Sequence, residues 1–365
     1  MYGNAEARNM KLLSHHLLDG FGAVGEGVSL QIAPDGRRIL WLAHESAPKN
    51  FSALDVSDPR APRLLVQTTL PHARLRSNSL EVVGNLMVVA YQTSQAGLSP
   101  AGFEVFDVAT PESPRSIGFY DLAGSGSRGC HQLWFVDGET VHISGSAPDL
   151  TARDARDDQI YQIVSVRNPT QPQLLGRWWP PGVMEGDAQP PPTRVAAPFG
   201  TAIRAHNTNV WPQRPDRAYL GYLDAGAYIL DISNRAAPRP VSQWRNAPPM
   251  KGFTHTMLPL FGRNLAVVAD ESIKNNAQDW PKLLWVLDIS DEAAPLAIST
   301  CPIDDPERYF TRGGRFGAHN LYENYPHPQS FRSERFVVGT FFNGGVRVFD
   351  LNNPFQPKEH AYFVP

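Results

Sequence analysis

Short runs of apolar residues, each ending in a polar turn that contains proline, recur along the whole chain. Most runs end at an Asp, which is replaced by Ser165 in the third copy. The pattern predicts a strand, a tight turn and a second strand, because Asp and Asn side chains bond nearby backbone N–H groups and Pro cannot donate to a ladder. The six copies span residues 51–65, 103–117, 161–175, 227–241, 284–298 and 346–360.

The spacing of the copies predicts a β-propeller. Two further strand-like runs lie between copies, for example 254–261 and 264–271 in the fifth unit. A period of roughly 40–60 residues built from short strands is the signature of propellers and arrays. We therefore expect an all-β fold with six four-stranded antiparallel blades around a central channel; seven blades, one of them degenerate, is the alternative. Approximate blades are 27–70, 76–121, 129–179, 204–245, 253–300 and 317–363.

The continuous repeat favours one domain over residues 1–365, although this length would also accommodate two smaller domains. The N-terminal segment 1–26 contains residues 9–19, which resemble an outer strand left over before the first blade. We expect this strand to pair with the last blade and close the ring. Closure would remove the exposed strand edges that otherwise invite aggregation.

The six turn motifs, such as FSALDVSDP at 51–59 and LWVLDISDE at 284–292, resemble the LVIVD-repeat family of β-propellers. The resemblance covers nearly the whole chain. It implies a propeller and, by itself, no particular chemistry.

Four histidines occupy the same point of the repeat. Each follows a small residue, precedes a short polar one and begins a strand-like run. Equivalent strands of a closed ring converge on its axis, so the four imidazoles should meet there. Neutral imidazoles suit Fe(II), our leading choice, or Cu, Ni or Zn, whereas Mg²⁺ and Ca²⁺ prefer oxygen. The four are His131, His206, His255 and His319; blades one and two offer Ser29 and Ser77 instead.

The four-histidine arrangement is similar to that of two other propeller groups. In carotenoid-cleavage oxygenases, four histidines from different blades hold iron, and propellers like selenium-binding protein and methanethiol oxidase also carry metal-binding histidines. The extended sequences do not match, so the resemblance implies oxidative metal chemistry by analogy alone.

Four long loops should share the rim where the histidines lie. Loops 180–203 and 301–316 are the expected lids, and 145–159 and 270–282 accompany them. Loops beyond about 12 residues in a compact domain are commonly lids or binding loops. The sequence therefore places substrate binding on this face.

Carboxylates near the histidines are candidate catalytic groups, either as bases or as partners that orient the imidazoles. Glu323 lies four residues after His319, and this even spacing puts both on one face of a strand. Asp270 and Glu271 end the second strand of the fifth blade, where the first blade has His44 and Glu45. The candidate catalytic residues are Asp270, Glu271 and Glu323.

Basic and aromatic residues of the long loops are candidates for substrate binding. Arg204, Arg312 and Arg315 could bind an anionic group, and Phe316 could form part of an apolar wall. Each has a structural alternative, because aromatic residues more often pack between blades and loop arginines are often solvated. The turn aspartates are expected to be structural.

Composition narrows the classes of partner and location. The net charge of −3 and the pI near 6.4 argue against a nucleic-acid surface. No apolar window is long enough for a membrane helix, no secretory signal is visible, and two cysteines imply no disulfide framework. We expect a cytoplasmic protein that acts on a small molecule; the sequence does not indicate its oligomeric state.

The leading functional hypothesis is a mononuclear metal enzyme that oxidises a small organic substrate, aromatic ones included, with O₂. A metal Lewis-acid hydrolase, lyase or isomerase is the alternative within the same class. A non-catalytic propeller that binds a partner through its long loops is the alternative from another class. In that case the histidines would be structural, as a single histidine at a strand start usually is.

Overall fold

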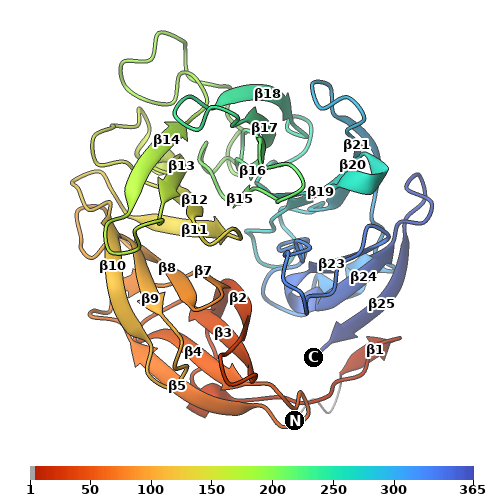
Figure 1. The fold of residues 1–365 in the computed structure, drawn as a ribbon. Coiled ribbons are helices and arrows are strands. Elements are labelled where there is room, and N and C mark those ends of the chain that lie inside the picture. The colour runs from red at the N-terminus through yellow and green to blue at the C-terminus, as the bar shows by residue number, and fades with distance from the viewer. Residues whose placement is uncertain (1–4) are drawn as a thin grey trace.

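Six antiparallel sheets stand around one axis in the computed structural model, which describes residues 5–365 (Figure 1). This arrangement confirms the predicted all-β propeller with six blades, and the seven-blade alternative is wrong. Helical structure among the described residues is limited to short 3-10 turns. These are η1 (Leu18–Gly20), η2 (Ala155–Asp157), η3 (Phe261–Arg263), η4 (Pro306–Tyr309) and η5 (Phe342–Gly344).

Blades one to three follow the chain from the innermost to the outermost strand. Blade one contains β2 (Val24–Ile32), β3 (Arg38–His44), β4 (Lys49–Asp55) and β5 (Arg63–Thr69). Blade two contains β6 (Leu75–Arg76) and β7 (Leu80–Val83), both paired with β8 (Leu86–Thr93), then β9 (Gly102–Asp107) and β10 (Arg115–Asp121). Blade three contains β11 (Cys130–Phe135), β12 (Thr140–Gly145), β13 (Ile160–Ser165) and β14 (Gln173–Trp178).

Blades four and five repeat this order. Blade four contains β15 (Thr208–Asn209), β16 (Arg217–Gly221), β17 (Ala227–Asp231) and β18 (Arg239–Trp244). Blade five contains β19 (Thr254–Leu260), β20 (Leu265–Asp270), β21 (Leu284–Asp288) and β22 (Leu296–Thr300).

Blade six departs from the predicted pattern on both sides. Its sheet runs β23 (Phe336–Thr340), β24 (Val346–Asp350), β25 (Lys358–Val364) and then β1 (Glu6–Arg8). The expected inner strand at 318–325 is reduced to a bridge between Leu321 and Gly339 and a few backbone bonds.

The ring is closed by β1, which pairs antiparallel with β25 and lies beside it in Figure 1. The closing strand is therefore Glu6–Arg8, not the expected 9–19, of which only Leu18 and Asp19 belong to a regular element, η1. Residues 1–4 of the expected N-terminal segment lie outside the described residues.

The turn aspartates stabilise the bends between the third and fourth strands, as expected. In five copies the Asp Oδ1 accepts the backbone N–H two residues later, at distances of 2.8–3.0 Å. This bond satisfies a turn amide that no strand partner reaches. The five are Asp55, Asp107, Asp231, Asp288 and Asp350.

The hydrophobic core lies between neighbouring blades, where the faces of the sheets pack on each other. The largest continuous cluster joins blades three to six, and a second one joins blades one and two. Trp41 and Trp134 are among its fully buried side chains. Burying a large apolar side chain contributes about 1.5–3 kcal/mol, so this packing holds the inner strands at fixed positions around the axis.

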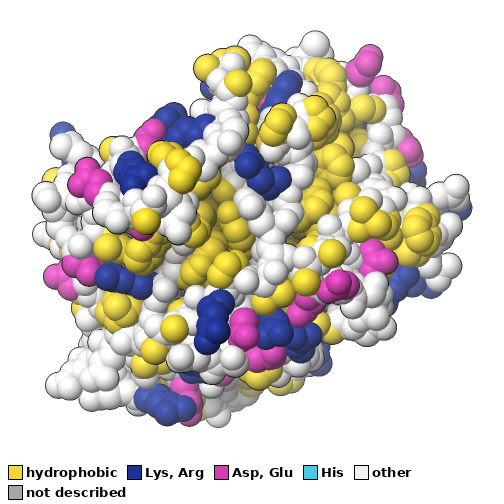
Figure 2. Space-filling model, turned by 90° about the horizontal axis from the view of Figure 1, so that it is seen from above, with side chains coloured by type: hydrophobic (Ala, Val, Ile, Leu, Met, Phe, Trp, Pro, Cys, Tyr) yellow, Lys and Arg dark blue, Asp and Glu magenta, His cyan; other side chains and the backbone are white. Residues whose placement is uncertain are grey.

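The outer surface carries mixed charge. Seen at right angles to the axis, acidic and basic side chains alternate on the visible face and do not gather into one patch (Figure 2). Within residues 5–365, no helix is long and apolar enough to cross a membrane.

Candidate metal centre

β-bulges aim the histidines at the axis. The pairing of β11 with β12 shifts register at His131, and that of β19 with β20 shifts at His255. A bulge places two residues opposite one and turns the side chain of the extra residue away from the regular alternation. Both imidazoles therefore leave the strand surface and enter the channel.

The other two histidines stand in the same backbone arrangement, although regular strand pairing is interrupted there. The N–H of His319 donates to the carbonyl of Thr340, whose own N–H donates to the carbonyl of Asn320. His206 makes the equivalent bond with Gly221. Recurrence of the bulge explains why the sequence pattern around the histidines repeats.

The four imidazoles form a continuous arc. Ring centroids of successive residues lie 4.5 Å apart for His131 and His206, 3.8 Å for His206 and His255, and 4.8 Å for His255 and His319. The Nε2 atoms of His131 and His206 are 2.9 Å apart.

Glu26 from blade one completes the group and was not predicted. Both Glu26 and Gly27 donate their N–H groups to the carbonyl of Asn78 in blade two. A Cβ at Gly25 would lie 2.7 Å from that carbonyl oxygen, and one at Gly27 would lie 2.2 Å from the amide nitrogen of Leu80. The two glycines thus let this strand approach blade two closely, with Glu26 between them.

The serines expected at the blade-one and blade-two positions have other partners. Ser29 Oγ accepts the N–H of Val82, and Ser77 Oγ donates to the carbonyl of Asn50. The expectation that blades one and two offer small hydroxyls to the axis is therefore wrong. Blade one instead offers a carboxylate, that of Glu26.

The Glu26 carboxylate faces the histidines. Its Oε2 lies 3.6 Å from His255 Nε2, and its Oε1 lies 3.8 Å from His319 Nε2. Ligand atoms in each of three sets lie within 4.8 Å of one another: Glu26 with His255 and His319, Glu26 with His131 and His206, and Glu271 with His206 and His255. These sets share members, so they describe one centre.

Hydrogen bonds on the far side of the rings orient them. Asn207 Nδ2 donates to Glu323 at 2.6 Å, which leaves Asn207 Oδ1 to accept from His206 Nδ1 at 2.9 Å. His255 Nδ1 lies 2.7 Å from Thr256 Oγ1. With Nδ1 of His206 carrying the proton, its Nε2 lone pair points into the group, as in a metal-ligating histidine.

Burial disfavours the charged form of two of the imidazoles. It lowers the pKa of His131 and His206 well below the usual range, and neighbouring imidazoles, His206 and His255 respectively, lower it further. Burial opposes ionisation of Glu26, but the surrounding histidines still hold its pKa well below the usual value. His319 differs, because burial opposes its charged form but the contact with Glu26 raises its pKa. One carboxylate thus stands among four imidazoles, which is a donor set for a cation.

A cavity of about 600 Å³, here called the upper cavity, lies above the histidines on the side of the long loops. His131, His206 and His319 form part of its wall. Its charged lining residues are Glu26, Glu45, Arg76, Arg204, Glu271 and Arg315. Its apolar lining includes Val24, Phe253, Ile273 and Phe342.

Some predicted site residues line the upper cavity. Glu271 Oε1 accepts from Arg315 at 2.9 Å and lies 3.7 Å from His319 Nε2. Arg204 also lines it, at the end of the first predicted lid loop. Arg315 is the contribution of loop 301–316. Among the described lining residues, none comes from 180–203.

Other predicted residues point elsewhere. Asp270 is buried within blade five, where it accepts from Asn246 Nδ2 at 2.7 Å and Trp285 Nε1 at 2.8 Å. Arg312 pairs with Glu6 near the closing strand. The structure thus gives both residues structural partners away from the upper cavity.

Phe316 is fully buried in a packed aromatic cluster, so it is not part of the cavity wall. Its ring stacks on Tyr309, with centroids 5.1 Å apart, and is tilted against Trp280 at 5.2 Å. This packing is the structural alternative considered for the loop aromatics.

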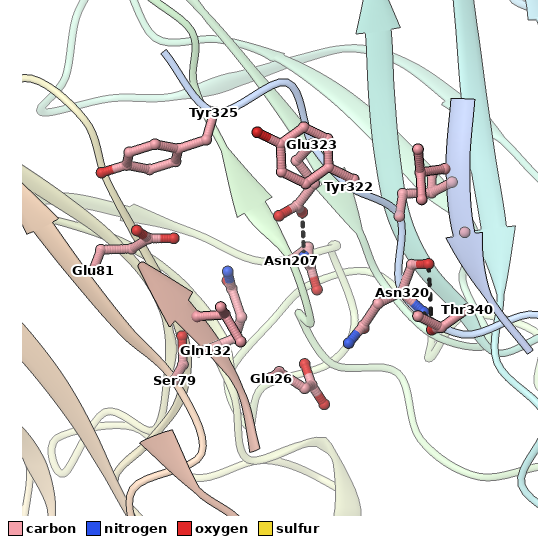
Figure 3. Close-up of a pocket in the computed structure, with 15 residues that line it drawn as sticks. Glu26, Ser79, Glu81, Gln132, Asn207, Asn320, Tyr322, Glu323, Tyr325 and Thr340 are labelled. Carbon is pink, nitrogen blue, oxygen red and sulfur yellow. Dashed lines mark hydrogen bonds between the residues drawn. The ribbon is translucent and has the colours of Figure 1, made fainter. Parts of the chain in front are cut away.

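Glu26 also borders a second space, the lower channel, which continues along the axis away from the lid loops. It has a volume of about 260 Å³. In Figure 3, Glu323 reaches down to Asn207, and Glu26 lies on the other side of Asn207. Its polar lining residues include Ser79, Glu81, Gln132, Asn207, Asn320, Glu323 and Tyr325.

Two carboxyl groups of the lower channel, those of Glu323 and Glu81, favour the protonated form. Burial raises the pKa of Glu323 to about 7, and burial raises that of Glu81 well above its usual value. Glu81 Oε2 has no hydrogen-bond partner among the described residues. The predicted catalytic residue Glu323 therefore lines the lower channel, and it is linked to His206 by hydrogen bonds through Asn207.

Comparison with known proteins supports the fold. Residues 216–244 match the LVIVD repeat, which confirms the resemblance to LVIVD-repeat propellers. No curated protein matches the chain. A crystal structure of a Lactobacillus plantarum protein has a TM-score of 0.58 at 11% identity, covering 94% of this chain and 90% of that one.

Two further solved structures are more distant. The computationally designed protein Ika8 has a TM-score of 0.46 at 12% identity, covering 91% of this chain and 74% of its own. Sqt1 from Chaetomium thermophilum has a TM-score of 0.48 at 10% identity, covering 91% and 70%.

Proposed function

We propose that this protein is a mononuclear transition-metal enzyme whose ion is held on the propeller axis by His131, His206, His255 and His319, with Glu26 beside them. The observation that carries the proposal is His255 Nε2, a buried nitrogen with no hydrogen-bond partner among the described residues, aimed between Glu26 and the neighbouring histidines. An unsatisfied buried polar atom costs about 1–3 kcal/mol, so a purely structural histidine would be expected to find a partner.

The donor set favours a transition-metal ion. Histidines together with one carboxylate and open coordination positions are typical of non-haem Fe(II), which keeps Fe(II) as the leading choice and Cu or Zn as the alternatives. When bound, such an ion supplies O₂ binding or Lewis acidity. We propose oxidation of a small organic substrate, with O₂ as the oxidant and the substrate as the electron donor.

The chain's own residues prepare the centre in three ways. Asn207 and Thr256 orient two of the imidazoles. The packed blades enclose the donor atoms and lower the local dielectric, which strengthens electrostatic interactions there. The upper cavity gives a substrate access to the histidines from the lid-loop side.

Glu271 supports the Lewis-acid alternative. Its carboxylate borders the upper cavity and lies near His319, at the place where a base would reach a bound substrate. Arg315 donates a hydrogen bond to one of the Glu271 carboxylate oxygens, Oε1. A hydrolase, lyase or isomerase reaction would use Glu271 as this base.

Metal content tests the proposal. Protein purified without oxygen, and then reconstituted with Fe(II), Cu(II) or Zn(II), is expected to hold about one ion per chain by elemental analysis. His206→Ala and His255→Ala should each abolish most of this binding. His142→Gln is the matched control, because His142 is also buried but bonds Tyr161 away from the axis.

Folding must be checked in parallel, by circular dichroism and thermal unfolding of each variant. Equal metal content in the histidine variants and the control, or no metal uptake by the folded parent protein, would overturn the proposal. The protein would then be a propeller scaffold that binds a partner.

A further inference from the structure

The charges that line the upper cavity are balanced before any ion is bound. Three carboxylates, of Glu26, Glu45 and Glu271, stand against three guanidinium groups. Two of the guanidinium groups are paired with carboxylates of the cavity: Arg315 with Glu271, and Arg76 with Glu45. A divalent ion at the histidines would leave the enclosed space with an excess of two positive charges, which favours an anionic ligand.

Arg204 is the one of these three arginines that is not paired with a carboxylate of the cavity. Its Nη1 is 3.9 Å from Asp158 Oδ1, but both oxygens of Asp158 already accept from Arg128, at 2.8 and 2.7 Å. Arg204 Nε has no hydrogen-bond partner among the described residues. The Arg204 guanidinium therefore lines the upper cavity without a carboxylate of its own.

Arg204 also lies close to the histidines. It precedes His206 by two residues and lines the upper cavity together with His131 and His206. Arg76 is on the same side, with Nη2 3.2 Å from His131 Nδ1. Two guanidinium groups thus flank one side of the candidate centre.

The rest of the upper cavity suits the organic part of a ligand. Phe253, Ile273 and Phe342 contribute apolar surface, and Phe342 stacks on the ring of His319 with centroids 4.6 Å apart. A volume of about 600 Å³ accommodates a small organic molecule together with water.

We propose that the upper cavity binds a small organic monocarboxylate, with its carboxylate on Arg204 and Arg76 and its apolar part against Phe253, Ile273 and Phe342. This inference rests on the proposed function, because the bound metal ion supplies the excess positive charge. A guanidinium group can bind a carboxylate through two parallel hydrogen bonds, which an alcohol or an amide cannot reproduce.

Benzoate is a suitable probe, and benzyl alcohol is its neutral counterpart. Isothermal titration of the full chain, reconstituted with Zn(II) to avoid oxidation, is expected to show benzoate binding and at least about tenfold weaker binding of benzyl alcohol. Arg204→Gln should weaken benzoate binding at least about tenfold, the effect expected for loss of a charge-assisted pair. Its zinc content should remain that of the parent protein.

Arg312→Gln is the matched control, because Arg312 comes from a lid loop but pairs with Glu6 outside the cavity. It should bind benzoate as the parent protein does. Equal benzoate affinity in Arg204→Gln and Arg312→Gln, or equal affinity of the parent for benzyl alcohol, would overturn the inference.

The zinc-free protein separates this inference from the proposed function. Benzoate binding that depends on Arg204 in a chain that takes up no metal would support the anion site and reject the metal centre. Normal zinc uptake with benzoate binding independent of Arg204 would reject the anion site and keep the metal centre.

Discussion

The upper cavity and the lower channel share one axis and one residue, Glu26, yet they handle charge in opposite ways. The upper cavity balances its carboxylates with arginines. The lower channel has Glu81 and Glu323 with no Lys or Arg among its described lining residues. Burial therefore raises the pKa of both carboxyls and favours their neutral forms.

This difference shows that position along the channel, more than residue type, decides what a carboxyl group can do. Although burial opposes its ionisation, the imidazoles around Glu26 hold its pKa well below the usual value, so it stays ionised and can attract a cation. A glutamate enclosed with amides and hydroxyls holds its proton and donates or accepts hydrogen bonds. The boundary between the two environments is the strand segment around Glu26.

The largest effect is expected from a substitution that moves the strand segment around Glu26, because this segment separates the two environments. Gly27→Ala would put a Cβ 2.2 Å from the Leu80 amide nitrogen and 2.8 Å from the Ser79 carbonyl carbon. We expect a loss of about 3 kcal/mol in the free energy of unfolding, the upper end of the usual range for overpacking, because rigid backbone must move; we also expect a loss of metal binding. Gly22→Ala, where no atom lies within 4 Å, is the control. Chemical denaturation would measure the stability and elemental analysis the metal; equal stability would contradict the tight approach at Gly27.

Charge in the lower channel can be tested through pH. The folded pKa of Glu323, about 7, exceeds its ordinary value of 4.5, so the folded protein retains this proton between those pH values while the unfolded chain releases it. Stability should fall as pH rises from 4.5 to 7, by up to about 3 kcal/mol, and then level off. Glu323→Gln can keep both contacts to Asn207 and Asn209 through its carbonyl oxygen and should lose this dependence.

The measurement is the difference between the two profiles of unfolding free energy from pH 4.5 to 8. Groups far from Glu323 cancel in this difference, so the change in slope reports on Glu323 together with Glu81, whose pKa is raised by burial and by the charge of Glu323. Parallel profiles would mean that this carboxyl titrates as it does in the unfolded chain.

Asn207 links the two spaces, because it bonds Glu323 on one side and His206 on the other. Asn207→Ala should lower metal affinity by about 10–100-fold, the usual cost of removing a group that orients a ligand. Competition with a chelating dye would measure this. Asn320→Ala, at the same position after His319, is the control, and an equal loss there would show that Asn207 has no orienting role.

The smallest expected effect has the opposite sign. Glu45 pairs with Arg76 at the rim of the upper cavity, where its side chain is 48% exposed. Glu45→Gln should free Arg76 and raise benzoate affinity by up to about fivefold, because exposed ion pairs are weak. Glu112→Gln, which removes an exposed partner of Arg37, is the control in the same titration. Weaker benzoate binding in Glu45→Gln would contradict the proposed role of Arg76.

The repeat made the fold and the four histidines predictable from sequence. Recurring strand and turn patterns indicated six blades, and recurrence of histidine at the start of the inner strands indicated convergence on the axis. The physical reason is that equivalent bulges in equivalent blades aim their side chains at one point.

Glu26 was missed because blade one lacks the histidine pattern. Its register against β3 shifts between Val24 and Val28, so simple alignment pointed to Ser29. The available signal was a charged residue between two glycines at the start of an otherwise apolar strand. Arg76 was missed because it lies in the two-residue strand β6 of blade two, where no motif repeats.

The sequence also could not show which of two neighbouring residues faces the upper cavity. Asp270 and Glu271 are consecutive, and successive side chains of a strand point to opposite faces. Asp270 consequently faces Trp285 inside blade five, while Glu271 faces the upper cavity. The long loops were harder still, because Phe316 and Arg312 are placed by contacts that no periodic pattern encodes.

The closing strand β1 has a mechanical consequence for the candidate centre. Glu26 follows the beginning of the ring and His319 precedes its end, so the two groups face each other across the seam where the chain meets itself. An ion bound by both groups would cross-link residues that are far apart in the sequence. Cross-links that close long loops constrain the unfolded chain most. Separation of β1 from β25 would pull Glu26 away from His319 and weaken metal binding. Retention of the metal would therefore report whether the ring is closed.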